Sequence, residues 1–283
     1  MKKNNVATFA KMKENNEKIS MLTSYDYSTA KLVDNSGVNA ILVGDSLGNV
    51  MLGYEDTVSV TMEDMITFGS AVSRACKNAM VVIDMPFMSY QISDEQALEN
   101  AGRLMKEARA NAVKLEGGKE VCSQIEKITS AGIPVMAHIG MTPQSVNAYG
   151  GFKVQGKDIE NAKKIVEDAL AVEKAGAFAV VIECVPADLA EYISKKLTIP
   201  TIGIGAGKGT DGQVLVYQDM LGMFSDYVPK FVKHYAKVGD IMQNAFEEYD
   251  REVKNCAFPS KEHTFAIDES VMEEIKKSFE FPF

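Results

Sequence analysis

Three acidic side chains stand where short apolar runs of the chain end. Asp45, Asp84 and Glu116 follow or close three consecutive runs of this kind. Ionised groups are seldom buried unless they are paired or bind a metal, and three carboxylates in one small volume repel one another. Ligands that are all oxygen favour a hard cation, so the pattern predicts a Mg²⁺ site with positions left open for water and substrate.

Other polar residues of these runs could act beside such an ion. Lys114 lies two positions before Glu116, on the same face of a strand, and could supply a positive charge to a carboxylate or an enolate oxygen. Glu183, flanked by apolar residues, is a candidate general base. Structural interpretations remain open: Lys114 and Glu116 as an ion pair, His138 as a core histidine bonded to a carbonyl, and the aspartates as turn residues.

Two further features also have a chemical and a structural interpretation. The glycine-rich run 203–209 follows the seventh apolar run, where many barrels bind phosphate. Its spacing is not that of a dinucleotide fingerprint or a P-loop, so close packing of the chain is favoured. Cys184 adjoins Glu183 and could be a nucleophile, but packing as a small apolar residue is the favoured interpretation.

The elements that must position these residues alternate along the chain. Eight short runs are almost continuously apolar, which is typical of parallel strands buried on both faces. The predicted strands are Ile19–Tyr25, Ala40–Gly44, Met80–Asp84, Ala112–Glu116, Pro134–Ile139, Ala179–Cys184, Thr201–Gly205 and Val214–Tyr217. Amphipathic segments between them predict helices at Ser28–Gly37, Thr61–Lys77, Ser93–Ala110, Asp158–Gly176 and Ala187–Leu197.

This alternation predicts an α/β fold, either a (β/α)₈ barrel or a doubly wound sheet, and we favour the barrel. In a barrel the polar residues named above would meet at the carboxyl ends of the strands. Thr61–Asp64 and Ser93–Gln96 have the pattern of a capping box, which predicts where two of the helices begin.

Composition excludes several classes of protein. The chain has 283 residues, 46% of them hydrophobic and 24% charged, which is ordinary for a soluble globular protein and excludes a disordered or collagen-like chain. The net charge of −9 argues against a nucleic-acid-binding protein, which needs a basic face. Four scattered cysteines indicate a reducing compartment. We see no signal peptide and no membrane span, and so expect a cytoplasmic protein.

No composition shift or linker marks a second domain. Residues 1–283 are therefore expected to form a single (β/α)₈ barrel domain. A charged C-terminal extension is expected from about residue 247, as a solvated tail or an oligomer contact.

Several long motifs, in the same order, resemble the ketopantoate hydroxymethyltransferase family. The resemblance runs from about Thr23 to Tyr235 and continues weakly at Phe258–Phe265. Its motifs are Val43–Gly48, Asp84–Tyr90, Val113–Gly118, His138–Ser145, Glu183–Pro186, Gly203–Gly207 and Asp211–Val216. The departures are mild: Met85 and Met141 stand where leucine is usual, and Lys208 where asparagine is common.

The resemblance implies a barrel of the phosphoenolpyruvate/pyruvate type, a Mg²⁺-dependent enzyme and a homodecamer of two stacked pentamers. The implied reaction transfers a hydroxymethyl group from 5,10-methylenetetrahydrofolate to the 2-oxo acid 3-methyl-2-oxobutanoate. The products would be 2-dehydropantoate and tetrahydrofolate, in pantothenate biosynthesis. The implied partners are therefore small molecules, and no motif indicates the folate site.

The same resemblance implies roles for residues at the matched positions. Asp45 and Asp84 would be metal ligands, and Glu116 would hold the ion directly or through water. The 2-oxo acid would bind at Asp45, Ser46, Asp84 and Lys114. Glu183 would be the proton acceptor, and His138 would lie near the site. Two alternatives stay open: a carbon–carbon lyase or mutase on the same barrel, and a barrel retained without catalytic activity.

Overall fold

The computed structural model describes residues 3–151, 153–223 and 228–279. Eight parallel strands form a closed barrel in sequence order, in which β1 pairs with both β2 and β8. This closure confirms the predicted (β/α)₈ barrel and excludes a doubly wound sheet. The strands are β1 (Ile19–Thr23), β2 (Ala40–Val43), β3 (Met80–Asp84), β4 (Ala112–Glu116), β5 (Val135–Gly140), β6 (Ala179–Glu183), β7 (Thr201–Ile204) and β8 (Gly212–Leu215).

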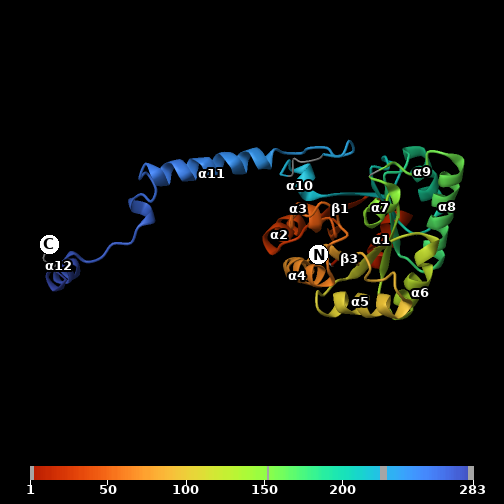
Figure 1. The fold of residues 1–283 in the computed structure, drawn as a ribbon, viewed down its shortest axis with the longest axis horizontal. Coiled ribbons are helices and arrows are strands. Elements are labelled where there is room, and N and C mark those ends of the chain that lie inside the picture. The colour runs from red at the N-terminus through yellow and green to blue at the C-terminus, as the bar shows by residue number, and fades with distance from the viewer. Residues whose placement is uncertain (1–2, 152, 224–227, 280–283) are drawn as a thin grey trace. The chain divides into compact units, whose positions relative to one another are not determined.

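Helices α2, α4, α5, α6, α8 and α9 surround the barrel (Figure 1). Their bounds are α2 (Tyr27–Asn35), α4 (Met62–Ala75), α5 (Asp94–Lys106), α6 (Cys122–Ser130), α8 (Ile159–Lys174) and α9 (Ala187–Lys196). Short helices α3 (Leu47–Val50), α7 (Val146–Tyr149) and α10 (Tyr217–Met220), with the 3₁₀ turns η1 (Lys119–Val121) and η2 (Pro143–Ser145), lie in the connections. The sequence analysis predicts five of these outer helices and misses α6.

Local side-chain chemistry determines where the helices begin. Thr61 and Asp64 form the reciprocal capping box expected at α4. At α5 only half of the predicted box exists, because Ser93 accepts from the backbone N–H of Gln96. The side chain of Gln96 instead contacts backbone groups of the preceding loop, at Met88 and Ile92.

The last strand is offset from the prediction of Val214–Tyr217. It begins at Gly212, next to the start of β1, and ends at Leu215. Tyr217 cannot continue the strand, since its N–H donates to the hydroxyl of Thr23 and it begins α10. The other strand predictions are correct to within two residues at each end.

Helix α1 (Val6–Glu14), which the sequence analysis does not predict, closes the amino end of the barrel. Phe9 is completely buried in the cluster of apolar side chains that fills the barrel interior. Asn4 and Lys13 hold the helix to the rim, through the carbonyl of Asn78 and the carboxylate of Asp211. The barrel is therefore a filled core that opens only at the carboxyl ends of its strands.

The glycine-rich run after β7 contains no helix and returns directly to β8. A Cβ atom on Gly207 would lie 2.5 Å from that of Ala187, and one on Gly209 would lie 2.5 Å from that of Glu191. Both partners belong to α9, so the glycines allow the chain to pass close over that helix. This supports the packing interpretation of the run.

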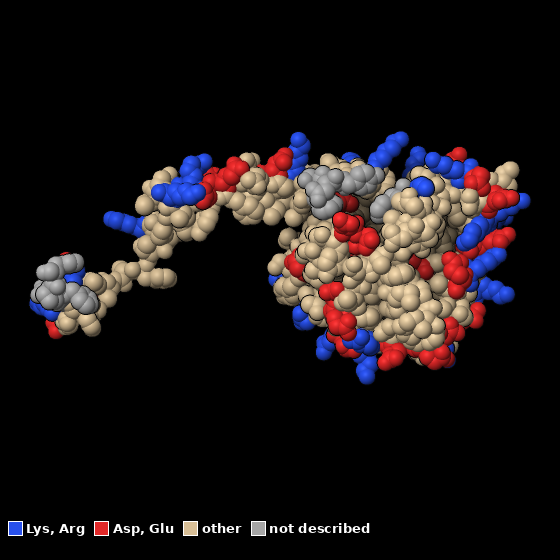
Figure 2. Space-filling model, in the orientation of Figure 1, with Lys and Arg blue, Asp and Glu red and all other residues tan. Residues whose placement is uncertain are grey.

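The chain divides into two units, Met1–Tyr235 and Ala236–Phe283. The second unit contains α11 (Val238–Lys254), the 3₁₀ turn η3 (Lys261–His263) and α12 (Glu269–Ser278). Residue 247, where the charged extension is predicted to begin, falls within α11. Acidic and basic side chains are interspersed over the face of the barrel in Figure 2. None of the helices in the described part of the chain is long and apolar enough to span a membrane.

Candidate active site

Five ionisable side chains continue the inward-facing series of the barrel strands. Alternate residues such as Met80 and Val82 of β3 belong to the interior apolar cluster, so the next residue of that series, Asp84, also faces inward. The same alternation turns the other side chains of this group into the carboxyl end of the barrel. They are Lys114 and Glu116 of β4, His138 of β5 and Glu183 of β6.

The strand register places these residues beside one another. Lys114 is the register partner of Asp84, and His138 is the register partner of Glu116. Glu183 is paired with Gly140, which has φ +95°. A Cβ atom on Gly140 would collide with the carbonyl oxygen of Glu183, so only glycine lets β5 approach the end of β6 so closely.

Asp45 and Ser46 enter the site from the turn after β2. The backbone N–H of Asp45 donates to Oδ2 of Asp84 at 3.1 Å, which joins the two predicted metal ligands directly. The hydroxyl groups of Ser46 and Tyr25 lie 2.8 Å apart. Tyr25 ends the first predicted strand but has no role in the sequence analysis. Here it orients Ser46, and burial raises the pKa of its phenol, which keeps the phenol neutral.

A buried ion pair joins Lys114 and Asp84. Lys114 Nζ lies 2.7 Å from Asp84 Oδ1, and the side chains are only 4% and 3% exposed. Burial acts to lower the pKa of Lys114, but the charges of Asp84, Glu116 and Asp45 outweigh it and raise that pKa. Lys114 is therefore a permanent cation of the site, and its partner is Asp84 rather than Glu116.

His138 lies between two carboxylates. Its Nδ1 is 3.3 Å from Oε1 of Glu116, and its Nε2 is 3.2 Å from Oε2 of Glu183. Neither contact has the alignment of a hydrogen bond, so we describe both as ion pairs. Burial and the charge of Lys114 act to lower the pKa of His138, yet the two carboxylates prevail and raise it to about 9. His138 is thus neither a simple core histidine nor bonded to a carbonyl.

The buried carboxylates of the site repel one another, and an additional bound cation would reduce this repulsion. Burial, with repulsion from Asp84 and Glu116, raises the pKa of Asp45 well above its usual range. Beyond its ion pair with Lys114, Oδ1 of Asp84 has no hydrogen-bond partner among the described residues. Carboxylate oxygens are the donors that Mg²⁺ prefers. Within the described ranges, however, no three His, Cys, Asp or Glu side chains are already gathered around a common point, so an ion would have to draw them together or bind partly through water.

Two residues that the sequence does not single out support the carboxylates, Gln144 by direct contact and Tyr90 through Gln144 and the backbone of Glu116. The side chain of Gln144 donates to Oδ2 of Asp45 at 2.8 Å, and its backbone N–H donates to Oε2 of Glu116 at 3.0 Å. The hydroxyl of Tyr90 accepts from the N–H of Glu116 and lies 2.7 Å from Oε1 of Gln144. Both residues lie within the matched motifs, but no local pattern indicates which atoms they contact.

Two other candidates are weaker. Burial and the neighbouring charge of Glu183 raise the thiol pKa of Cys184 to about 12, which argues against a nucleophile.

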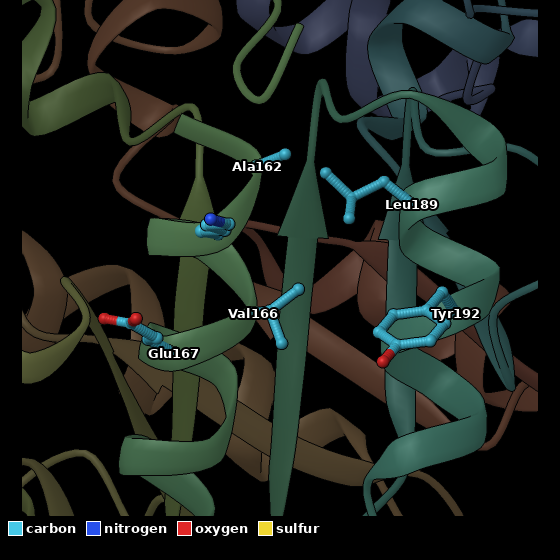
Figure 3. A pocket seen from close by; sticks show the side chains of 6 residues that line it. Ala162, Val166, Glu167, Leu189 and Tyr192 are labelled. Atoms are coloured by element: carbon cyan, nitrogen blue, oxygen red, sulfur yellow. The ribbon is translucent and has the colours of Figure 1, made fainter. Parts of the chain in front are cut away.

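A groove of about 340 Å³ lies between α8 and α9 (Figure 3), where Val166 faces Leu189 and Tyr192. The groove is on the outer wall rather than at the strand ends, and its charged residues are exposed. We assign the chemistry to the barrel mouth.

The fold is a (β/α)₈ barrel, and carboxylates, a lysine and a histidine are buried at the carboxyl ends of its strands. Together these features define a TIM-barrel enzyme. Solved structures of that class resemble this fold. They include 2,3-dimethylmalate lyase, described as a member of the PEP mutase/isocitrate lyase superfamily (TM-score 0.58, 14% identity, covering 96% of this chain and 98% of the other). Phosphonopyruvate hydrolase is similar in fold (TM-score 0.61, 12% identity, covering 97% and 96%).

The chain belongs to the ketopantoate hydroxymethyltransferase family, whose model matches residues 3–261. Relatives named 3-methyl-2-oxobutanoate hydroxymethyltransferase include proteins of Clostridium novyi (strain NT), 66% identical, and Enterococcus faecalis (strain ATCC 700802 / V583), 64% identical. Each alignment covers 96% of this chain and 99% of the relative. The protein is therefore a transferase built on a (β/α)₈ barrel, and the resemblance expected from the motifs is confirmed. This membership speaks against both the lyase and the non-catalytic alternatives.

Proposed function

We propose that the protein transfers a hydroxymethyl group from 5,10-methylenetetrahydrofolate to 3-methyl-2-oxobutanoate, giving 2-dehydropantoate and tetrahydrofolate for pantothenate biosynthesis. The names of its relatives support this reaction and the 2-oxo acid. The observation that carries the proposal is the ion pair of Glu183 with His138, at the same carboxyl end of the barrel where Lys114, Asp84 and Asp45 meet. This arrangement supports Glu183 as a base beside a site for the anionic part of a 2-oxo acid.

Asp45 and Asp84 would hold a Mg²⁺ ion, with Glu116 as a direct or water-mediated ligand. When bound, Mg²⁺ would supply Lewis-acid chemistry, which polarises the ketone and acidifies the neighbouring C–H group. The excess of buried carboxylate charge around Asp45 supports this assignment.

Lys114 and Ser46 would bind and orient the substrate. Because Lys114 stays protonated, it offers positive charge to the substrate carboxylate or to the enolate oxygen that forms after deprotonation. Ser46 would hold the carboxylate through its hydroxyl or its backbone N–H, in an orientation that Tyr25 fixes.

Glu183 would remove the proton from C3 of 3-methyl-2-oxobutanoate. With 15% of its side chain exposed, it is more open than the 3%-exposed His138 behind it and can meet a substrate entering the mouth. His138 would keep the carboxylate oriented and stabilise its charge before the transfer. C3 would then form a bond to the methylene carbon of the folate, while the bonds from that carbon to the nitrogens at positions 5 and 10 of the folate break. Water would supply the hydroxyl group, and the C3 proton and the second proton of water would go to the two nitrogens of the departing tetrahydrofolate.

Proton exchange at C3 tests the proposal without the folate. The protein is incubated with 3-methyl-2-oxobutanoate in D₂O, with and without Mg²⁺, and the C3 proton is followed by NMR. We expect Mg²⁺-dependent loss of the signal, followed by 2-dehydropantoate formation once 5,10-methylenetetrahydrofolate is added. No exchange, either alone or with tetrahydrofolate present, would overturn the substrate assignment.

We also propose that the active form is a homodecamer. Exposed apolar side chains on α11 support association, among them Ile241, Phe246 and Tyr249. Light scattering after size-exclusion chromatography should give a mass ten times the 30.9 kDa of the chain. A monomer or dimer at assay concentration would contradict this assembly.

A further inference from the structure

Gln144 is a buried amide at the centre of the site. It lies in η2, directly after Pro143, and is only 4% exposed. Its Nε2 donates to Oδ2 of Asp45 at 2.8 Å and to the carbonyl oxygen of Met85 at 3.0 Å. These two bonds use both hydrogens of the amide nitrogen.

The other end of the amide lies between an amide NH₂ group and a hydroxyl, whose single hydrogen can also go to the carbonyl oxygen of Glu116 at an O···O distance of 3.0 Å. Oε1 of Gln144 lies 2.7 Å from the hydroxyl of Tyr90 and accepts from Nε2 of Gln91 at 3.3 Å. A flipped amide would set its oxygen against the carboxylate of Asp45 and the carbonyl of Met85, and its NH₂ group against the NH₂ group of Gln91. The surrounding groups therefore permit a single orientation, in which the NH₂ group faces Asp45.

The main chain of the same residue acts on a second carboxylate. Its backbone N–H donates to Oε2 of Glu116 at 3.0 Å. One residue thus orients Asp45 through its side chain and Glu116 through its backbone. A substitution at position 144 can remove the first bond while the second remains, because every residue except proline keeps the N–H.

We propose that Gln144 is a positioning residue for the metal site: its amide holds Oδ2 of Asp45 and so fixes the orientation of the carboxylate that would bind the cation. An unrestrained carboxylate rotates about its terminal torsion, and outer-shell hydrogen bonds of this kind commonly set the affinity of a metal ligand. The inference rests on the proposed function, because it takes Asp45 as a Mg²⁺ ligand.

The test compares two substitutions of a buried glutamine by an apolar side chain of similar length. Gln144→Met removes the bond to Asp45, and Gln124→Met is the matched control, since Gln124 is buried on α6 and contacts Ser123. Mg²⁺ binding is measured by titration calorimetry without substrate, and folding by circular dichroism and thermal melting. We expect the Mg²⁺ dissociation constant to rise about tenfold or more in Gln144→Met and to change less than about twofold in the control.

A double variant at positions 144 and 45 distinguishes a positioning role of Gln144 from a general structural role. If Gln144 acts through Asp45, then adding Gln144→Met to Asp45→Asn should weaken Mg²⁺ binding little further, whereas independent effects would add. An unchanged dissociation constant in a folded Gln144→Met variant, or fully additive effects in the double variant, would overturn the inference.

A second variant, Gln144→Asn, tests the same inference if Gln144→Met does not fold. Gln144→Asn keeps an amide but withdraws it by one methylene from Asp45, so it should weaken Mg²⁺ binding in the same direction with less damage to packing. Wild-type binding in Gln144→Asn would contradict the inference. Failure of the proposed function is distinguishable, because the wild-type protein would then bind no Mg²⁺ and exchange no C3 proton.

Discussion

His138 joins Glu183 to Glu116: its Nε2 lies 3.2 Å from Oε2 of Glu183, and its Nδ1 lies 3.3 Å from Oε1 of Glu116. The proposed base and a proposed metal-site carboxylate therefore share one imidazole. This relationship follows from register, since His138 pairs with Glu116 across β4 and β5, while Glu183 closes the neighbouring strand β6. A change in the charge of Glu183 or Glu116 should therefore change the pKa of His138.

Replacing the proposed base should separate proton removal from metal binding. In Glu183→Gln we expect C3 exchange to fall by about 10²- to 10⁴-fold, because the amide cannot accept the proton. Mg²⁺ binding should stay normal, as measured by calorimetry. Glu191→Gln, a surface change on α9, is the matched control and should exchange at the wild-type rate. Retained exchange in Glu183→Gln would remove this residue from the base role.

Asp84→Asn should weaken Mg²⁺ binding by about tenfold or more, because it removes a ligand charge and the partner of Lys114. The dissociation constant is measured by calorimetry, with thermal melting to show that the barrel is intact. Asp188→Asn, near the start of α9, provides a control for the change of charge alone. An unchanged magnesium titration would count against the ligand assignment.

The raised pKa of His138 makes stability depend on pH. Its carboxylate partners raise the pKa from 6.5 to about 9 against burial, so the folded chain holds this proton more tightly than the unfolded chain. The stabilisation is therefore complete below pH 6.5 and is lost as pH rises through about 9, by up to about 1.4 kcal/mol per pH unit. Urea unfolding without Mg²⁺ should show this fall in the wild type.

Two variants test whether His138 causes this pH dependence of stability. His138→Gln should flatten the pH dependence between pH 6.5 and about 9, because it removes the titrating group. His263→Gln, an exposed histidine of the second unit, should leave the wild-type slope unchanged. A wild-type slope that persists in His138→Gln would assign the titration to another group.

Phe9→Ala should destabilise the barrel by about 3–5 kcal/mol, since it opens a cavity in the apolar cluster inside the strands. Denaturant unfolding measures the free energy. Leu32→Ala removes an apolar side chain that is 73% exposed on α2, and should cost less than about 1 kcal/mol. If both substitutions lowered the free energy of unfolding equally, α1 would not seal the barrel interior.

Much of the barrel could be predicted because its strands are buried on both faces. Continuous apolar runs such as Met80–Asp84 and Ala112–Glu116 match β3 and β4 in full. Prediction fails where the deciding contact is distant in sequence. The apolar residues of helix α1 are spread around it rather than gathered on one face, and the helix is stabilised by the barrel end that it covers. The outer helix α6 is missed although Ile125 and Ile128 show helical spacing.

The predicted site residues do lie together at the barrel mouth, but their ion-pair and hydrogen-bond partners could not be predicted from the sequence. Lys114 and Glu116 share a strand face, which made an ion pair between them plausible. The closed sheet instead pairs Lys114 with Asp84 and Glu116 with His138. Gln144 illustrates the limit best, because its partner Asp45 lies 99 positions away.

The sequence by itself determined the α/β fold class, the family and the types of chemical group available, because burial periodicity and motifs are written along the chain. Closure of the strands into a barrel was decided by the tertiary structure. Only the tertiary structure decided which groups meet. Barrel closure and strand register bring Glu183 to His138, and the turn after β5 brings Gln144 to Asp45. Pairing among buried charges depends on distance and desolvation in the folded state, and neither is set by separation along the chain.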